Sequence, residues 1–213
     1  MKNEFGKTNP GIWDLKEIAI VIIDFQPQML ASITSGNRDY IEHNTKALAR
    51  LATALEIPTV MSSVGVGIGI NDPVVSTISE ELPTGQQIID RNTMNAWDDE
   101  VFVAAVKATG KKKLVMVGLY TEICLTFPAI EALNEGFDVM TITDAIGGIS
   151  IEANKMAIKR MIQAGVVPNT LVAFITEIFR DWTKPEVAKI GPILEWHKEF
   201  VTNINLPGVG VWQ

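Results

Sequence analysis

The chain has 213 residues, a net charge of −7 and a single cysteine. This length can bury a sizeable core without disulfides or a structural metal, and one cysteine excludes an intramolecular bridge. The acidic balance argues against a nucleic-acid partner, because such binding draws on clustered Lys and Arg. The longest apolar runs are too short to cross a bilayer, and the first fifteen residues lack the apolar segment of a secretory signal. We expect a soluble cytoplasmic protein.

Apolar runs of five to seven residues alternate with longer segments of helical period. This alternation is typical of βαβ units, whose parallel sheet is buried on both faces. The predicted strands are residues 18–24, 59–64, 86–90, 113–119, 138–143 and 170–175. The predicted helices are residues 38–56, 97–109, 121–135 and 151–165, with another near 185–200. The pattern predicts an α/β fold with a six-stranded parallel sheet flanked by helices.

Glycines mark the predicted ends of several helices. Gly110, Gly136 and Gly165 stand where a residue in left-handed conformation would end each of three helices. The glycine-rich stretch SVGVGIGINDP at residues 63–73 lacks the GxGxxG spacing, and it suits a packed loop better than a phosphate cradle. The chain shows neither an internal repeat nor a linker. We expect one domain over residues 1–213, with a core at about 15–185 and a C-terminal helix and tail at 185–213.

Three polar residues fall at or beside the carboxyl ends of predicted strands, where functional groups gather in parallel α/β sheets. Asp24 closes the first strand, Arg91 follows the third, and Cys124 lies on the first turn after the fourth. Each has an ordinary alternative: a capping carboxylate, an ion-pair arginine and a buried apolar thiol. Their convergence at one edge favours a catalytic group.

An acid, a fixed cation and a thiol together suit covalent catalysis. A helix N-terminus and Arg91 would both stabilise the Cys124 thiolate. Asp24 could accept the thiol proton and later deliver it to a leaving amine. The backbone amides of Tyr120 and Cys124 could hold the developing oxyanion.

Three segments carry a family resemblance: IAIVIIDFQPQML, DRNTMNAWDDEVF and VMVGLYTEICLTFPAIEALNEGFDVMTITDA. They resemble the motif regions of the isochorismatase-like cysteine hydrolases, and TEICLTFPA and RDW are most similar to the YcaC-type branch. The resemblance covers about residues 15–185. It implies a three-layer Rossmann-like fold without nucleotide binding and an Asp–Lys–Cys type triad. Asp24 matches the acid, Cys124 the nucleophile, and Arg91 stands where most of the family has lysine.

The departures from the family pattern are informative. Arginine is effectively never deprotonated in proteins, so Asp24 would carry the proton transfers alone. The resemblance also implies a cis peptide ahead of the nucleophile, which by position is Leu119–Tyr120. Nicotinamidase-type members have an Asp/His cluster after the second strand, whereas this chain reads SSVGVGIGIND there, and His43 and His197 lack ligand spacing. We expect no metal and no cofactor.

Residues beside the three motifs are candidates for a substrate pocket, which an apolar wall with a few polar groups would suit. The candidates are Phe25, Gln26, Asn95, Trp97, Tyr120 and Phe127. Core packing is an equal alternative for Trp97 and Phe127. The other tryptophans are assigned to packing or subunit contacts: Trp13, Trp182, Trp196 and Trp212.

These observations predict a cysteine hydrolase that cleaves a C–N bond, other than a peptide bond, in a small molecule through a thioester. Two alternatives stay open: the same scaffold acting on another acyl or imine substrate, and a catalytically idle oligomeric scaffold. The apolar composition and the tail predict a homo-oligomer. The YcaC-type resemblance implies an octamer of two stacked rings of four. Neither nucleic acid nor membrane is expected as a partner.

Overall fold

The computed structural model describes residues 11–210. Six strands form one parallel sheet in the order β3-β2-β1-β4-β5-β6. The strands are β1 (Ile18–Ile23), β2 (Thr59–Val64), β3 (Ile88–Arg91), β4 (Lys113–Gly118), β5 (Asp138–Ile142) and β6 (Val167–Asn169). The predicted α/β class and six-stranded parallel sheet are confirmed.

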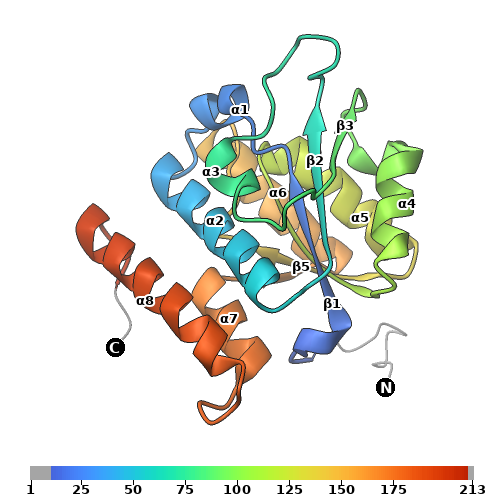
Figure 1. Ribbon diagram of the computed structural model, residues 1–213. Helices are drawn as coiled ribbons and strands as arrows, with labels where there is room; N and C mark the ends of the chain where they lie inside the picture. Colours follow the sequence, from blue (N-terminus) through green and yellow to red (C-terminus); the bar gives the residue numbers. More distant parts are fainter. Residues whose placement is uncertain (1–10, 211–213) are drawn as a thin grey trace.

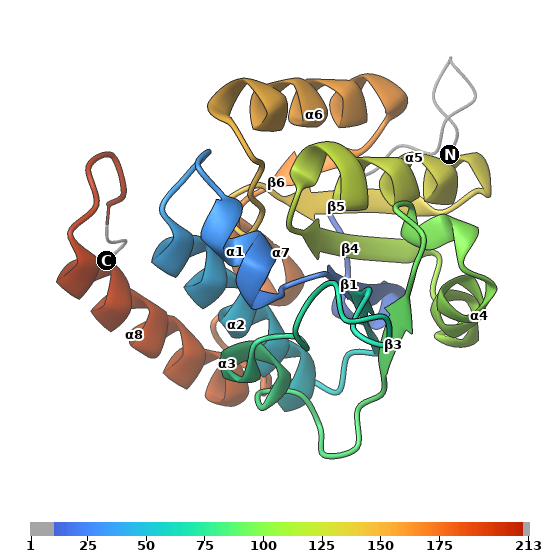
Figure 2. The same cartoon turned by 90° about the horizontal axis from the view of Figure 1, so that it is seen from above.

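The helices lie in layers on the two faces of the sheet (Figures 1 and 2). One face carries α4 (Glu100–Ala108), α5 (Thr126–Asn134) and α6 (Ile151–Ala164), and the other carries α2 (Arg38–Ala54) and α7 (Leu171–Phe179). The remaining helical segments are η1 (Leu15–Glu17), α1 (Pro27–Ser32), α3 (Ser76–Ser79), η2 (Ala96–Asp98), η3 (Thr121–Leu125) and α8 (Val187–Ile204). Helix α8 packs along the outer side of α2.

The core explains why the central strands read as uninterrupted apolar runs. Every residue of β1 is buried, because helices cover both faces of the sheet. Gly110, Gly136 and Gly165 have positive φ angles of 67°, 86° and 113°, as expected for residues that end α4, α5 and α6. Among residues 11–210, none of the helices has the length and apolarity needed to cross a bilayer.

The sixth predicted strand is wrong. Residues 170–175 open helix α7, and the strand is the shorter segment Val167–Asn169 before them. The buried residues of α7 recur at helical spacing, and the Asp144 carboxylate accepts a hydrogen bond from the Leu171 N–H (2.9 Å) at its start. Pro168 fits β6 because an edge strand leaves one row of N–H groups unpaired.

The strand order places β1 beside β4 at the centre of the sheet. The chain winds outward from β1 through β2 to β3, and then outward from β4 through β5 to β6. The carboxyl ends of β1 and β4 therefore form a topological switch point, where connections leave in opposite directions. Asp24 and Cys124 follow these two strands.

Candidate active site

Asp24 is the residue directly after β1, and it is fully buried. Its backbone adopts a left-handed conformation, with φ of 60°, which Asp tolerates better than most residues. Its N–H donates to the Ser62 carbonyl of β2 (3.0 Å). The sharp turn ends the strand at this residue and keeps its carboxylate at the edge of the sheet.

Arg91 is the last residue of β3, and only 2% of its surface is exposed. One terminal nitrogen of the guanidinium donates to Asp24 Oδ2 and the other to the Thr93 carbonyl. The side chain thus reaches past the end of β2 to the acid of β1. A planar fork with several donors can hold two such acceptors at once.

Cys124 reaches the same place from β4. The strand ends at Gly118, where a Cβ would lie 3.2 Å from the Ile23 Cβ, so glycine permits close packing against β1. Tyr120 follows in left-handed conformation (φ 51°, ψ 61°) and leads into the π-helical turn η3, which carries the cysteine. The thiol lies close enough to the Asp24 carboxylate for the two groups to shift each other's pKa. The structure therefore brings the three predicted residues into one buried group.

The peptide bond before Tyr120 corrects one expectation. All peptide bonds within residues 11–210 are trans, including Leu119–Tyr120. The left-handed conformation of Tyr120 makes the turn without a cis bond.

The electrostatics of the thiol correct a second expectation. Burial and the neighbouring Asp24 charge raise the pKa of Cys124 to about 12, and they outweigh Arg91, which acts in the opposite direction. The Cys124 N–H already donates to the Tyr120 carbonyl (3.0 Å), so the residue lies one turn inside the helical segment rather than on its first free N–H groups. The surroundings of Cys124 thus favour the thiol, whereas the sequence led us to expect a thiolate.

Asp24 is affected by the same burial. Loss of water raises the pKa of its carboxyl, while Arg91 and the hydrogen bonds from Cys124 and Ser62 oppose the rise. A raised pKa makes Asp24 a better proton acceptor than an exposed aspartate, which is the property that a general base requires.

The two proposed oxyanion amides differ in their present bonding. The Tyr120 N–H donates no hydrogen bond within the described part of the chain. The Cys124 N–H is engaged by the Tyr120 carbonyl, so it would have to release or share that bond. Of these two amides in the described part of the chain, the Tyr120 N–H is the one without an acceptor.

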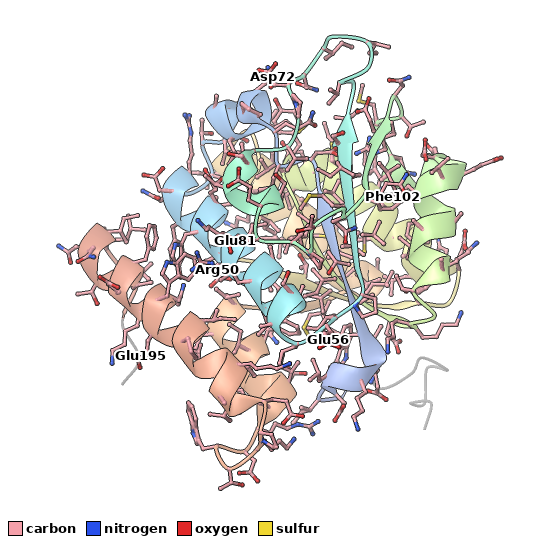
Figure 3. The ribbon with its side chains drawn as sticks, in the orientation of Figure 1. Arg50, Glu56, Asp72, Glu81, Phe102 and Glu195 are labelled. Carbon is pink, nitrogen blue, oxygen red and sulfur yellow. The ribbon has the colours of Figure 1, made fainter. Side chains whose placement is uncertain are left out.

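The polar groups of two predicted pocket residues, Gln26 and Asn95, already form hydrogen bonds within the protein. The Gln26 amide bonds to Val64 N–H (3.0 Å) and to the Val64 and Asp72 carbonyls (3.2 and 2.8 Å), so it clamps the base of loop 65–72. Asp72 lies beside α1 (Figure 3). Asn95 accepts from the Trp97 N–H (3.0 Å) and caps η2.

The aromatic candidates are divided between core and surface. Trp97 packs edge-on against Phe102 and Phe137, and its indole N–H donates to Glu135 (2.9 Å). Phe137 directly precedes β5, so the Trp97 ring packed against it lies toward the amino edge of the sheet. This position favours core packing over a pocket role for Trp97. Phe25 is fully buried, and Phe127 is half-buried beneath Arg160 of α6.

The remaining tryptophans occupy varied positions. Trp13 is fully buried, Trp196 is half-buried against α2, and Trp182 is 60% exposed. Trp212 lies outside the described residues. Within residues 11–210, the acidic, cysteine and histidine side chains form no group of three or more placed to hold a metal ion.

Sequence reasoning missed Ser62. This residue of β2 is fully buried, and its hydroxyl donates to Asp24 Oδ1 (3.2 Å). The available signal was a pair of serines that interrupts an otherwise apolar strand. One of them must face the core, since successive side chains of a strand point to opposite faces.

The fold and the site together define a class: a doubly wound α/β protein with a buried acid, guanidinium and thiol at its switch point. The isochorismatase domain model matches residues 18–171, and the chain therefore belongs to the isochorismatase family. An Escherichia coli (strain K12) protein named "Probable hydrolase YcaC" is 37% identical over 169 residues, which cover 79% of this chain and 81% of the relative.

Two solved structures extend the comparison. The Escherichia coli YcaC gene product, described as an octameric hydrolase of unknown specificity, has a TM-score of 0.82 and 33% identity, and the match covers 92% of this chain and 97% of that one. YcaC from Pseudomonas aeruginosa, with hexane-2,5-diol and covalent acrylamide, has a TM-score of 0.83 and 31% identity, covering 94% and 100%. The similarity to isochorismatase-like, YcaC-type proteins thus spans nearly the whole fold.

Proposed function

We propose that this protein is a cysteine-dependent hydrolase that cleaves a C–N bond of a small molecule, other than a peptide bond, through a thioester. The observation that carries the proposal is the buried group itself, in which Asp24 accepts a hydrogen bond from Arg91 and the Cys124 thiol lies within reach of the Asp24 charge. A buried ion pair with a thiol at a switch point has no evident structural need, since apolar side chains of similar volume would fill the space at lower cost.

The proposed reaction has two halves. In the first, Cys124 Sγ attacks the carbonyl carbon while Asp24 takes the thiol proton, and the oxyanion forms near the Tyr120 N–H. Collapse of this intermediate breaks the C–N bond, Asp24 returns the proton to the leaving nitrogen, and an amine and a thioester result. In the second half, Asp24 takes a proton from water, which attacks the thioester, and the acid leaves as the thiol regains a proton.

The resting protonation states suit this sequence. The raised pKa of Cys124 keeps the proton on sulfur until a base accepts it, and the raised pKa of Asp24 makes it that base. Arg91 holds the carboxylate and balances charge without exchanging protons. The covalent acrylamide named for the Pseudomonas aeruginosa structure supports the proposal, because acrylamide is an electrophile to which thiols add.

The direct experiment is a screen of small amides, ureides and hydroxamates for release of ammonia or amine. Cys124→Ala serves as the blank, because it removes the nucleophile and leaves the rest of the site in place. A substrate hydrolysed by the wild type and not by Cys124→Ala would support the proposal. Equal turnover by both proteins would refute it.

The burial of Cys124, with 2% of its surface exposed, favours one alternative: a catalytically idle scaffold with an inert thiol. Alkylation separates the two. An inert thiol with a pKa near 12 reacts very slowly with iodoacetamide at pH 7, and Asp24→Asn makes it no slower, because the Asp24 charge raises the pKa of the thiol. A catalytic thiol reacts faster in the wild type, since Asp24 accepts its proton.

We also propose that the protein is a homo-oligomer of cyclic or dihedral symmetry and that it acts in the cytoplasm on a small-molecule substrate. The octameric state named for the Escherichia coli relative supports the assembly, as do exposed apolar side chains such as Ile70, Met94 and Ile151. Light scattering at micromolar concentration tests it, and a monomer mass would refute it.

A further inference from the structure

We infer that Ser62 is a positioning residue for Asp24: its buried hydroxyl holds the carboxylate charged and oriented to accept the Cys124 proton. This inference rests on the proposed function. Register explains the placement. Ser62 pairs with Ile23 in the parallel ladder, and the Asp24 N–H donates to the Ser62 carbonyl (3.0 Å). The backbones of these two residues are therefore fixed against each other before their side chains meet.

The two oxygens of the Asp24 carboxylate accept hydrogen bonds from different residues. Arg91 occupies Oδ2, and the Ser62 hydroxyl donates to Oδ1 at 3.2 Å, in a place where neither Asp24 nor Ser62 has any exposed surface. In a buried position, hydrogen-bond donors that point at a carboxylate favour its charged form, which burial disfavours. The Ser62 hydroxyl donates to the carboxylate oxygen that Arg91 does not contact. This second donor fixes the rotation of the carboxylate about its Cβ–Cγ bond.

A neutral hydroxyl suits this role better than a second cation. It favours the charged form of Asp24 by donating a hydrogen bond, yet it adds no charge that would hold the carboxylate ionised when it must accept a proton. Arg91 alone contacts one oxygen only. Ser62 therefore tunes how readily the Asp24 carboxylate accepts the proton from Cys124.

The next residue of β2 provides a matched control. Ser63 points to the opposite side of the strand, where its hydroxyl donates to Asp90 Oδ1 (2.9 Å), and Asp90 in turn accepts from the Val66 and Gly67 N–H groups. Ser63→Ala removes the same hydroxyl from the same strand without touching Asp24. Any general loosening of β2 would affect both alanine variants.

The experiment measures the rate of Cys124 alkylation by iodoacetamide from pH 4 to pH 10, read by intact mass. The full-length wild type is compared with Ser62→Ala, Ser63→Ala and Asp24→Asn, each checked for folding by circular dichroism. The acid limb is the low-pH part of the profile, where the alkylation rate rises with pH. We expect Ser62→Ala to shift this limb to higher pH by about one unit, so that alkylation at a given pH on the limb is roughly tenfold slower. Ser63→Ala should superimpose on the wild type, and Asp24→Asn should abolish the limb.

The outcomes separate the two proposals. If Asp24→Asn abolishes the limb and Ser62→Ala superimposes on the wild type, the inference about Ser62 is overturned and the proposed function stands. Equal shifts in Ser62→Ala and Ser63→Ala also overturn the inference. If Asp24→Asn keeps the wild-type limb, Asp24 is not the proton acceptor, and the proposed mechanism fails together with the inference.

Discussion

Acid should weaken the contact between α2 and α8 through His43. This ring is buried in a stack between Trp196 (centroids 3.9 Å apart) and Phe200 (3.6 Å), and the Arg50 guanidinium covers the far face of Trp196 at 3.8 Å. Arg50, labelled in Figure 3, also forms two hydrogen bonds with Glu81. Burial lowers the pKa of His43 to about 3, with smaller effects of His197, Arg50 and Lys46 in the same direction.

The sign and size follow from linkage. An unfolded chain protonates this histidine below about pH 6.5, whereas the folded protein does so only near pH 3, so the unfolded state binds more protons in between. Stability therefore falls as pH drops through 6.5, and the loss is complete below about 3. A difference of about 3.5 pKa units limits the loss to about 5 kcal/mol, of which about 2 kcal/mol is reached at pH 5.

The assay is urea unfolding of the wild type and His43→Phe between pH 8 and pH 5, at one protein concentration. Phenylalanine keeps an aromatic ring in the stack and removes the titration. Comparing the two proteins cancels the other groups whose pKa values shift, such as Asp24 and Asp144. We expect His43→Phe to gain about 2 kcal/mol relative to the wild type over this range. Parallel stability profiles would refute the reasoning.

The remaining predictions concern the candidate active site and the packing of Gly147 against Ile33. Arg91→Ala should move Cys124 alkylation to higher pH, because a charge favouring the thiolate is lost, while Arg91→Lys should keep part of the activity; superimposable wild-type and alanine profiles would assign Arg91 to an ordinary ion pair. Asp24→Asn should abolish turnover of any substrate found, which steady-state kinetics would show. Hydrolysis should survive prolonged EDTA treatment, and restoration of lost activity by zinc would contradict our view of the site. Gly147→Ala should lower the urea midpoint, at a cost of about 1–3 kcal/mol, because the new Cβ would lie 2.7 Å from Ile33 Cγ2; an unchanged midpoint would show that α1 moves freely.

The sheet could be predicted from the sequence because its central strands are buried on both faces and leave long apolar runs. The failure at residues 170–175 shows the limit of that signal. The five apolar residues in a row from Leu171 to Ile175 fit a buried strand or a helix equally well. The strand that forms, Val167–Asn169, is too short and too polar to stand out, and Pro168 argues against a central strand. Tertiary contacts, such as the Asp144 hydrogen bond at Leu171, decide the outcome.

The candidate site was predictable in its members and less so in its electrostatics. Asp24, Arg91 and Cys124 follow parallel strands, and parallel strands bring their carboxyl ends to one edge. Sequence position next to a helix start suggested a thiolate at Cys124. Position does not report burial, and burial has the larger effect on the pKa of Cys124 here, so the site favours a thiol. Ser62 escaped notice because its partner, Asp24, is distant in sequence.

Arg91 makes the charge balance of the proposed site simple, because an arginine keeps its positive charge throughout. At rest, the thiol is neutral and the Asp24 carboxylate is paired with the Arg91 guanidinium. When the proton moves from Cys124 to Asp24, one negative charge moves to sulfur and then to the substrate oxyanion, while the guanidinium keeps its positive charge. The net charge of the buried group is therefore zero at each step. Because an unbalanced charge in a buried site is costly, this constancy would allow a thiol with a pKa near 12 to act as the proposed nucleophile: its proton would pass to Asp24, and the charge left behind would stay beside Arg91.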